Sequence, residues 1–212
     1  RFFASPDFAS VNTPVSFLTV HMADALMHVV RLKPTAVRAT GFKQKLPGLS
    51  PIPVDGYDMV DTEIRFETGA LAHVITGWHL PDAAHAVTVQ SGRIICRDGL
   101  LDLALDRCGY HEIVEDGIFE RNVLFLSREP DGLVSGYGIE SPGRFLKRVH
   151  QIRRGQREAG NWLEELLDPF MAGFYTTLVL QGAHESLAAG RATPEGVVTG
   201  ELVELEDGGV RS

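Results

Sequence analysis

Hydrophobic residues recur at helical spacing near the start of the chain and predict its first helix, over about residues 13–31. Asn12 or Thr13 is placed to cap this helix, and Pro14 follows at the first helical position, where a missing N–H costs nothing. The apolar residues fall within an arc of about 120°. They predict one buried stripe made of Val15, Leu18, Met22, Ala25, Leu26, Val29 and Leu32.

A second strip is predicted beside the first on the same helix. Phe17, His21, Asp24 and His28 are three or four residues apart, so their side chains share one helix face. Two imidazoles and a carboxylate are therefore expected to edge the core, and they are the first candidates for chemistry in the chain.

After Pro34 the hydrophobic period changes to two, which is typical of half-buried strands. Strands are predicted at 35–42, 59–66, 70–79, 86–90, 93–97, 100–105, 122–126 and 197–205, and further helices at 143–154 and 162–189. Consecutive strands joined by short turns form a meander rather than an alternation of strand and helix. The pattern predicts an α+β fold, with an open, mostly antiparallel sheet and helices packed on one face.

Composition narrows the class of protein. The 212 residues are 44% hydrophobic and 23% charged, which favours a single globular domain over 1–212. The formal net charge of -8 argues against a nucleic-acid partner, since binding a polyanion needs clustered Lys and Arg. No apolar run of about 18 residues predicts a membrane span, and the two cysteines are too few for a disulfide framework, so we expect a cytoplasmic protein.

The sequence also lacks the glycine-rich phosphate motifs of nucleotide-binding domains. No strand is followed by G-x-G-x-x-G, and no G-x-x-x-x-G-K-[ST] loop occurs. The chain starts at Arg1 without an initiator methionine, which we interpret as a sign of a piece cut from a longer protein.

Several short motifs together resemble one family. His21 and Asp24 form His-x-x-Asp on the first helix, Gly41-Phe42-Lys43 follows, and a strand pair carries Asp58, Phe66, Gly69, Ala70, Ala72, Trp78 and Pro81. In this order and spacing, the chain resembles the C-terminal domain of the Gfo/Idh/MocA family, the group of glucose-fructose oxidoreductase and inositol dehydrogenase. The resemblance covers nearly the whole chain.

The resemblance implies a two-domain oxidoreductase whose Rossmann half precedes Arg1. Family members transfer a hydride between NAD or NADP and a sugar or polyol, so His21 matches the general acid/base and Asp24 the carboxylate three residues later. The family also has a carboxylate four residues before the histidine, where this chain has Phe17. That departure leaves the acid/base role open, with Asp24 and His28 as the neighbours that could act on His21 instead.

Other interpretations of these residues remain open. His21 could bond a backbone group, and Asp24 a local donor; the three polar residues of the strip could also bind a metal, although a zinc site needs ligands from elsewhere. Trp78 and His79 could line a sugar pocket or belong to the core. The loop 41–53 could be a lid, and Cys96 and Cys108 could be unpaired thiols.

We therefore expect the substrate-binding and oligomerisation domain of an NAD(P)-dependent oxidoreductase for a sugar, polyol or related hydroxy compound. His21 is the catalytic candidate, and Asp24, His28, Trp78 and His79 are the substrate-binding candidates. Alone, the domain would bind no dinucleotide and would not turn over. A non-catalytic sugar-binding or regulatory protein is the alternative, so whether the parent protein is an enzyme stays open. Apolar positions on both sheet faces favour a homo-oligomer formed through the open face.

Overall fold

The computed structural model of this chain describes residues 12–49, 54–81, 88–104, 109–114, 117–122, 127–128, 134–136, 139–156, 159–206 and 209–211. The chain divides into two compact units, one formed by Arg1–His79 with Leu163–Ser212 and the other by Leu80–Trp162. The described helices include none that is both long and apolar enough to cross a bilayer.

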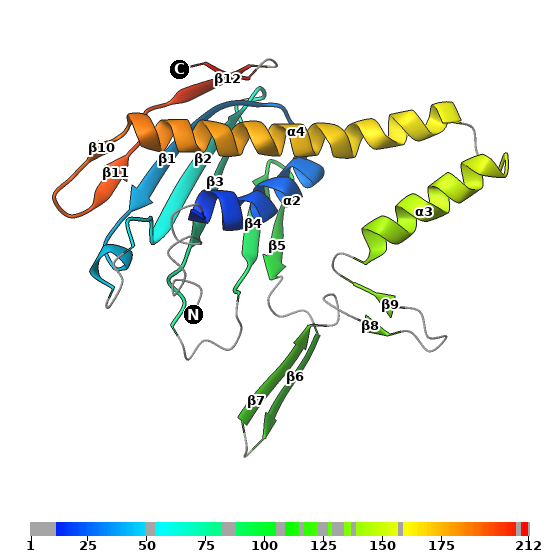
Figure 1. Ribbon diagram of the computed structural model, residues 1–212, viewed down its shortest axis with the longest axis horizontal. Helices are drawn as coiled ribbons and strands as arrows, with labels where there is room; N and C mark the ends of the chain where they lie inside the picture. Colours follow the sequence, from blue (N-terminus) through cyan, green and yellow to red (C-terminus); the bar gives the residue numbers. More distant parts are fainter. Residues whose placement is uncertain are drawn as a thin grey trace. The chain divides into compact units, whose positions relative to one another are not determined.

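Seven strands of the described part of the first unit form one antiparallel sheet (Figure 1). Its central strand, β1 (Pro34–Phe42), pairs along one edge with β2 (Met59–Phe66). Along its other edge it pairs with two short strands near the end of the chain, β11 (Val197–Thr199) and β12 (Val203–Glu206). The other strands are β3 (Leu71–Gly77), β10 (Arg191–Ala192) and β13 (Gly209–Arg211). β3 extends the sheet beyond β2, so the order is open and not closed.

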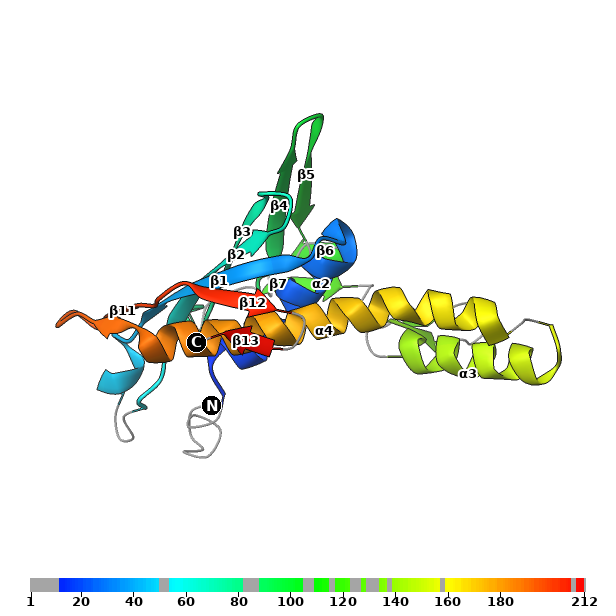
Figure 2. The ribbon, with the colours of Figure 1, turned by 90° about the horizontal axis from the view of Figure 1, so that it is seen from above.

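Burial alternates along the strands and defines two different sheet faces. On β2, Val60, Thr62 and Ile64 are buried, whereas the residues between them are less buried. The π-helical turn η2 (Val15–Thr19), helix α2 (Val20–Val30) and helix α4 (Ala159–Ala189), whose residues from Leu163 onward belong to this unit, lie on one face of the sheet (Figure 2). The core between them contains Val15, Met27, Val37, Ala39, Val60, Ile64, Phe66, Val179, Ala183, Leu187 and Leu205.

This arrangement confirms the predicted α+β fold with an open, mainly antiparallel sheet and helices on one face. The face away from α2 and α4 carries polar and charged residues on β2 and exposed apolar residues on β3. The predicted strand at 197–205 is wrong in one respect, because Gly200 separates it into β11 and β12.

The described part of the second unit contains three short hairpins, helix α3 (Glu140–Arg153) and the first residues of α4. The hairpins are β4 (Ser91–Cys96) with β5 (Gly99–Ala104), β6 (Gly109–Val114) with β7 (Gly117–Asn122), and β8 (Ser127–Arg128) with β9 (Val134–Ser135). The hairpin of β4 and β5 agrees with the prediction to within two residues at each boundary. The β6–β7 hairpin was not predicted. Of the predicted strand at 86–90, residues 86–87 lie outside the described residues and residues 88–90 form no strand. Of the predicted strand at 122–126, only Asn122 is described, as the last residue of β7.

Candidate functional site

The helix that carries the candidate histidines begins with a reciprocal cap and a wide first turn. The backbone N–H of Ser16 donates to Thr13 Oγ1 at 3.2 Å, and the N–H of Thr13 donates to Ser16 Oγ at 3.1 Å. This confirms Thr13 as the capping residue, with Pro14 first in the helix. The next five residues form the π turn η2, a kind of bulge that occurs often at functional sites.

One buried hydrogen bond ties this turn to the sheet. The hydroxyl oxygens of Thr19, in η2, and Thr76, in β3, lie 2.7 Å apart, and Thr76 Oγ1 also donates to the carbonyl of Pro14 at 3.4 Å. Both threonines are buried, so the bond is shielded from water and fixes the start of α2 against the end of β3.

The buried stripe of α2 differs from the predicted one. Ala25 and Val29, predicted in the core, are exposed, whereas Ala23 and Met27 are buried in line with Thr19. A π turn holds more residues per turn than an α-helix, so it rotates the following side chains around the axis. The prediction assumed one uninterrupted α-helix and was therefore wrong at Ala25 and Val29. It is confirmed at Val15, which is buried, and at Met22, Leu26 and Leu32, which pack against the core.

The rotation also changes the environment of the polar strip. His21 and His28 are exposed and Asp24 is partly exposed, on the side of α2 opposite the buried stripe. The strip does not edge the core as expected but presents its imidazoles and carboxylate outward. In this unit it is a surface that another domain or a ligand could cover.

Within the strip, the structure pairs Asp24 with His28. Asp24 Oδ2 lies 3.7 Å from His28 Nε2, with both side chains about half exposed (48% and 47%). Among the described residues, no hydrogen bond or ion pair joins His21 to either of them. The structure thus places one imidazole and one carboxylate of the strip next to each other, both accessible to solvent.

Phe17 connects the strip to the end of β3. Its ring lies 5.5 Å from that of Trp78, centroid to centroid, at an interplanar angle of 41°. Trp78 also packs against a small cluster in the loop after β1, formed by Leu46 and Val54. The structure thus brings the predicted strip and the predicted pocket residue Trp78 together through an aromatic pair, at the position where the family resemblance would place a carboxylate.

His79 follows Trp78 and is exposed. A side chain on Gly77 would place its Cβ 2.7 Å from His79 Nδ1 and 2.6 Å from the carbonyl oxygen of Asp58, so only glycine allows this close approach. His79 therefore lies against the backbone at the end of β3, with its ring accessible to a polar ligand.

The loop after β1 is held by Asp58, a residue that pattern reasoning used only as part of the family motif. Its carboxylate accepts hydrogen bonds from the backbone N–H groups of Gln44, Lys45 and Leu46, at 2.5, 2.7 and 2.7 Å. The short 3₁₀ turn η3 (Leu46–Gly48) begins at these amides. Of the predicted lid at 41–53, residues 50–53 lie outside the described residues. The part before them is held in place by the hydrogen bonds from residues 44–46 to Asp58.

A lysine and a tyrosine flank that loop. Lys43 Nζ lies 2.7 Å from Asp55 Oδ1 and 4.8 Å from the centre of the Tyr57 ring. Partial burial raises the pKa of the Tyr57 hydroxyl, nearby Lys43 opposes that rise, and Asp55 adds to it. Tyr57 is therefore a neutral phenol at physiological pH.

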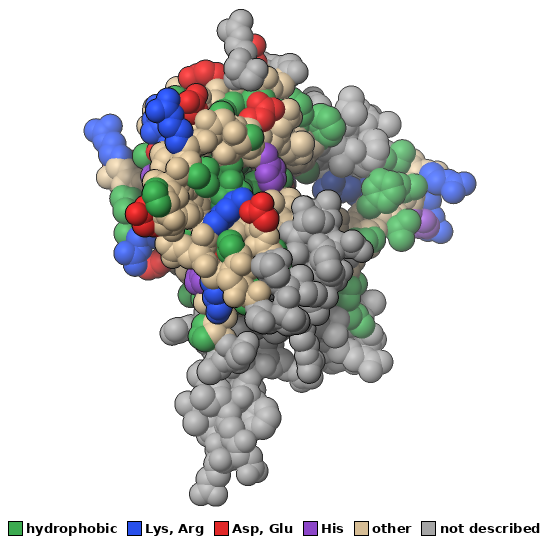
Figure 3. All heavy atoms as spheres, turned by 60° about the vertical axis from the view of Figure 1, so that its left-hand side comes forward, with side chains coloured by type: hydrophobic (Ala, Val, Ile, Leu, Met, Phe, Trp, Pro, Cys, Tyr) green, Lys and Arg blue, Asp and Glu red, His purple; other side chains and the backbone are tan. Residues whose placement is uncertain are grey.

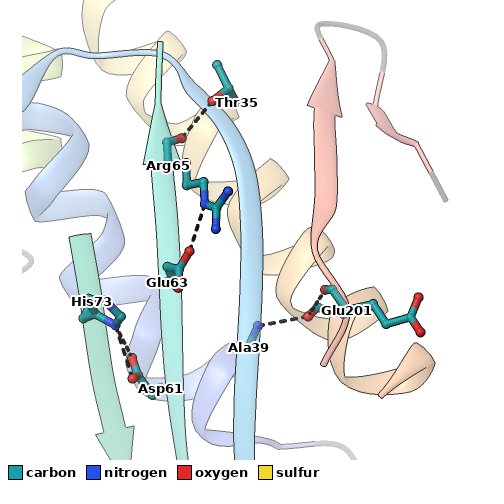
Figure 4. Close-up of polar contacts among 8 residues, drawn as sticks. Thr35, Ala39, Asp61, Glu63, Arg65, His73 and Glu201 are labelled. Carbon is teal, nitrogen blue, oxygen red and sulfur yellow. Dashed lines mark hydrogen bonds and ion pairs between the residues drawn. The ribbon is translucent and has the colours of Figure 1, made fainter. Parts of the chain in front are cut away.

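On the other sheet face, polar side chains cross neighbouring strands. His73 Nδ1 lies 3.2 Å from each carboxylate oxygen of Asp61, and Arg65 Nε donates to Glu63 Oε1 at 2.9 Å (Figure 4). His73 belongs to β3 and Asp61 to β2, on the face away from the helices. This face is separate from the strip on α2, so His73 and His79 have different surroundings.

The described residues do not fit a dinucleotide or a metal. The consecutive backbone N–H groups of residues 44–46, which follow β1, already donate to the Asp58 carboxylate, so they are not available to a pyrophosphate. Among the same residues, no group of three His, Cys, Asp or Glu side chains could hold a metal ion. Cys96 is an exposed free thiol, and Cys108 lies outside the description. On the face shown in Figure 3, charged side chains of both signs are interspersed with hydrophobic ones.

No family model and no curated protein matches the chain. Solved structures do match its fold. Scyllo-inositol dehydrogenase from Lactobacillus casei, in a structure with bound NAD(H) and scyllo-inositol, aligns with 91% of this chain and 51% of its own, with a TM-score of 0.53 and 18% identity. An oxidoreductase of unconfirmed activity from Thermotoga maritima aligns with 87% of this chain and 46% of its own, with a TM-score of 0.51 and 14% identity.

The chain spans about half the length of these oxidoreductases. At these identities the matches establish the fold and nothing finer. The fold is shared with about half of each of these oxidoreductase chains, which agrees with the resemblance that the sequence indicated.

Proposed function

We propose that this chain is the substrate-binding and oligomerisation domain of an NAD(P)-dependent oxidoreductase that acts on a sugar, polyol or related hydroxy compound. The observation that carries the proposal is the fold shared with half of scyllo-inositol dehydrogenase, whose structure holds NAD(H) and scyllo-inositol. The outward-facing strip on α2 supports it, because the reacting groups of a two-domain oxidoreductase must face the partner domain.

In this proposal the residues of the strip handle the proton and the substrate hydroxyls. His21, whose side chain is exposed on α2, accepts the proton of the hydroxyl whose carbon is oxidised. Asp24 and His28 bind neighbouring hydroxyls, with Trp78 and His79 as further contacts for the ring. The hydride acceptor, NAD or NADP, is bound by the other domain of the oxidoreductase.

The test assays the full-length protein with NAD and with NADP against scyllo-inositol, myo-inositol and a panel of sugars, following the absorbance of the reduced nicotinamide. His21→Ala should lower turnover by about 10² or more, the usual contribution of a general acid/base. Ala25→Ser, on the exposed side of the same helix, is the matched control and should leave the rate unchanged. Full activity in His21→Ala would remove the assigned role, and a protein that neither binds nor oxidises any of the compounds would overturn the proposal.

A second candidate is a binding protein of the same fold that transfers no hydride. The aromatic pair of Phe17 and Trp78 favours it, because an apolar pair stands where the family resemblance would place a carboxylate. Aromatic faces pack well against the C–H groups of sugars, so binding would survive without chemistry. This candidate predicts saturable sugar binding without reduction of the nicotinamide. It also predicts the same sugar affinity in His21→Ala as in the parent protein.

The open sheet face supports the oligomerisation part of the proposal. Leu71 and Ile75 on β3 are 58% and 61% exposed, and between them lies His73, paired with Asp61 on β2. A face with exposed apolar residues and charges of both signs is complementary to a second copy of itself across a two-fold axis. We assign the homo-oligomer interface to this face.

A further inference from the structure

Asp58, which immediately precedes β2, connects three segments of the chain. Its backbone N–H donates to the carbonyl of Phe42 at 2.7 Å, and its own carbonyl accepts the N–H of Trp78 at 2.8 Å. Its side chain accepts the three amide bonds from residues 44–46 described above. One residue thus fixes the ends of β1 and β3 and the loop after β1 relative to each other. Bonds from N–H groups to a charged carboxylate are stronger than bonds between neutral groups.

The loop that Asp58 holds supports the indole of Trp78. Leu46, the last of the three amide donors, is 4% exposed and forms a cluster with Val54, against which Leu49 and Trp78 pack. The carbonyl of Leu46 also accepts the N–H of Val54 at 3.0 Å, so the loop closes on itself. The path from the carboxylate to the indole is therefore short: Asp58 sets Leu46, and Leu46 supports one side of Trp78.

The same residue limits where His79 can lie. The backbone of Gly77 passes close to both Asp58 and His79. A Cβ at Gly77 would lie 2.6 Å from the carbonyl oxygen of Asp58 and 2.7 Å from Nδ1 of His79. A change in the position of Asp58 would therefore move both residues that follow Gly77. The indole of Trp78 also contacts Phe17, which belongs to the π turn before His21.

We infer that Asp58 is a positioning residue for the sugar-binding surface formed by Trp78 and His79. It acts through the loop at 44–49 and through the end of β3 and does not touch the ligand itself. The inference rests on the proposed function for the identity of the ligand, whereas the effect of Asp58 on Trp78 can be measured without any ligand.

The experiment uses the fluorescence of Trp78 in the full chain. The chain has two tryptophans, so Trp162→Phe leaves Trp78 as the only indole. In this background, Asp58→Asn places an amide where three N–H groups converge, and it should shift the emission to longer wavelength and raise quenching by acrylamide. Asp55→Asn is the matched control, because that carboxylate is 90% exposed and contacts Lys43. Scyllo-inositol binding, measured by calorimetry on the full-length protein, should weaken by about tenfold in Asp58→Asn only, as expected when site residues move by about 1 Å.

Each outcome separates the inference from the proposed function. Unchanged emission and unchanged affinity in Asp58→Asn would overturn the inference. If the parent protein binds neither scyllo-inositol nor a sugar, the proposed function fails, while a shifted emission still supports the role of Asp58 in placing Trp78. Should Asp58→Asn not fold, Leu46→Ala removes the support of the indole and keeps the carboxylate. The same red shift in Leu46→Ala supports the path, and an unchanged spectrum contradicts it.

Discussion

The hydroxyl of Ser186 is inserted into the backbone ladder beside Ala39. Ser186 Oγ accepts the N–H of Ala39 at 2.9 Å and donates to the carbonyl of Glu201 at 2.5 Å, where the strand that pairs with β1 bulges between β11 and β12 (Figure 4). The next bond of the ladder resumes from Gly200 N–H to the carbonyl of Ala39. A side chain from α4 thus replaces a missing strand partner and joins the helix to the sheet.

Replacing Ser186 by alanine should destabilise the first unit by about 1–3 kcal/mol, the cost of leaving a buried donor and acceptor without partners. Ser186 is fully buried, so water cannot easily take the place of its hydroxyl. Urea unfolding followed by circular dichroism measures the difference. Thr177→Ala is the control, because the Thr177 hydroxyl bonds the carbonyl of Gly173 within the exposed side of α4. Its loss should stay within about 0.5 kcal/mol, and equal losses in the two variants would contradict the role of Ser186.

The same bulge explains why the sheet was only partly predictable. Alternation of apolar and polar residues is a local property, and it located β1, β2 and β3 to within a few residues because each has one buried face. The break between β11 and β12 depends on Gly200, whose Cβ would lie 2.5 Å from the carbonyl oxygen of Ala39 and even nearer to Ser186 Oγ. That contact joins residues far apart in the chain, so no periodicity reports it.

The candidate site was predictable in its residue types and less so in its geometry. His21, Asp24 and His28 share one helix face as predicted, since spacing alone sets that property. Their exposure was not predictable, because it depends on the π turn that rotates α2. The role of Asp58 was also not visible, because three amide donors from one loop converge on it only in the folded chain. A carboxylate that accepts hydrogen bonds from several backbone N–H groups of a loop leaves no pattern in the sequence.

Thr19 and Thr76 offer a direct measurement of how η2 is attached to the sheet. Thr76→Val alone leaves the buried Thr19 hydroxyl without its partner and should cost about 1–3 kcal/mol. Thr19→Val should cost less, because Thr76 Oγ1 keeps its hydrogen bond to the carbonyl of Pro14, and the double variant replaces both hydroxyls by apolar groups of similar shape. The double variant should therefore lose less than the sum of the two single losses. A double-mutant cycle from urea unfolding gives the coupling energy, and strictly additive losses would show that the two hydroxyls do not interact.

Self-association through the open sheet face can be tested at one exposed residue. Ile75 is 61% exposed on β3, so Ile75→Lys should change the free energy of unfolding of a single chain by no more than about 0.5 kcal/mol. If the face is the interface, a lysine there should shift the protein to smaller assemblies, because it would bury an unpaired charge on association. Sedimentation velocity measures the distribution. Val29→Lys, on an exposed position of α2, is the control, and an unchanged distribution in Ile75→Lys would place the interface elsewhere.

His184 on α4 should make the stability of the first unit fall in mild acid. Partial burial lowers the pKa of its imidazole below the ordinary value of 6.5, so the folded chain holds it neutral while the unfolded chain protonates it more readily. The lowered pKa of His184 therefore does not reduce the free energy of unfolding above about pH 6.5. It reduces that free energy increasingly as the pH falls from there toward the folded-state pKa. His184→Gln removes this difference, so its melting temperature should drop less than that of the parent between about pH 7.5 and pH 5.5. His21→Gln, on an exposed position, should keep the parent's full drop. A His184→Gln protein with the same pH dependence as the parent would mean that burial does not hold this imidazole neutral.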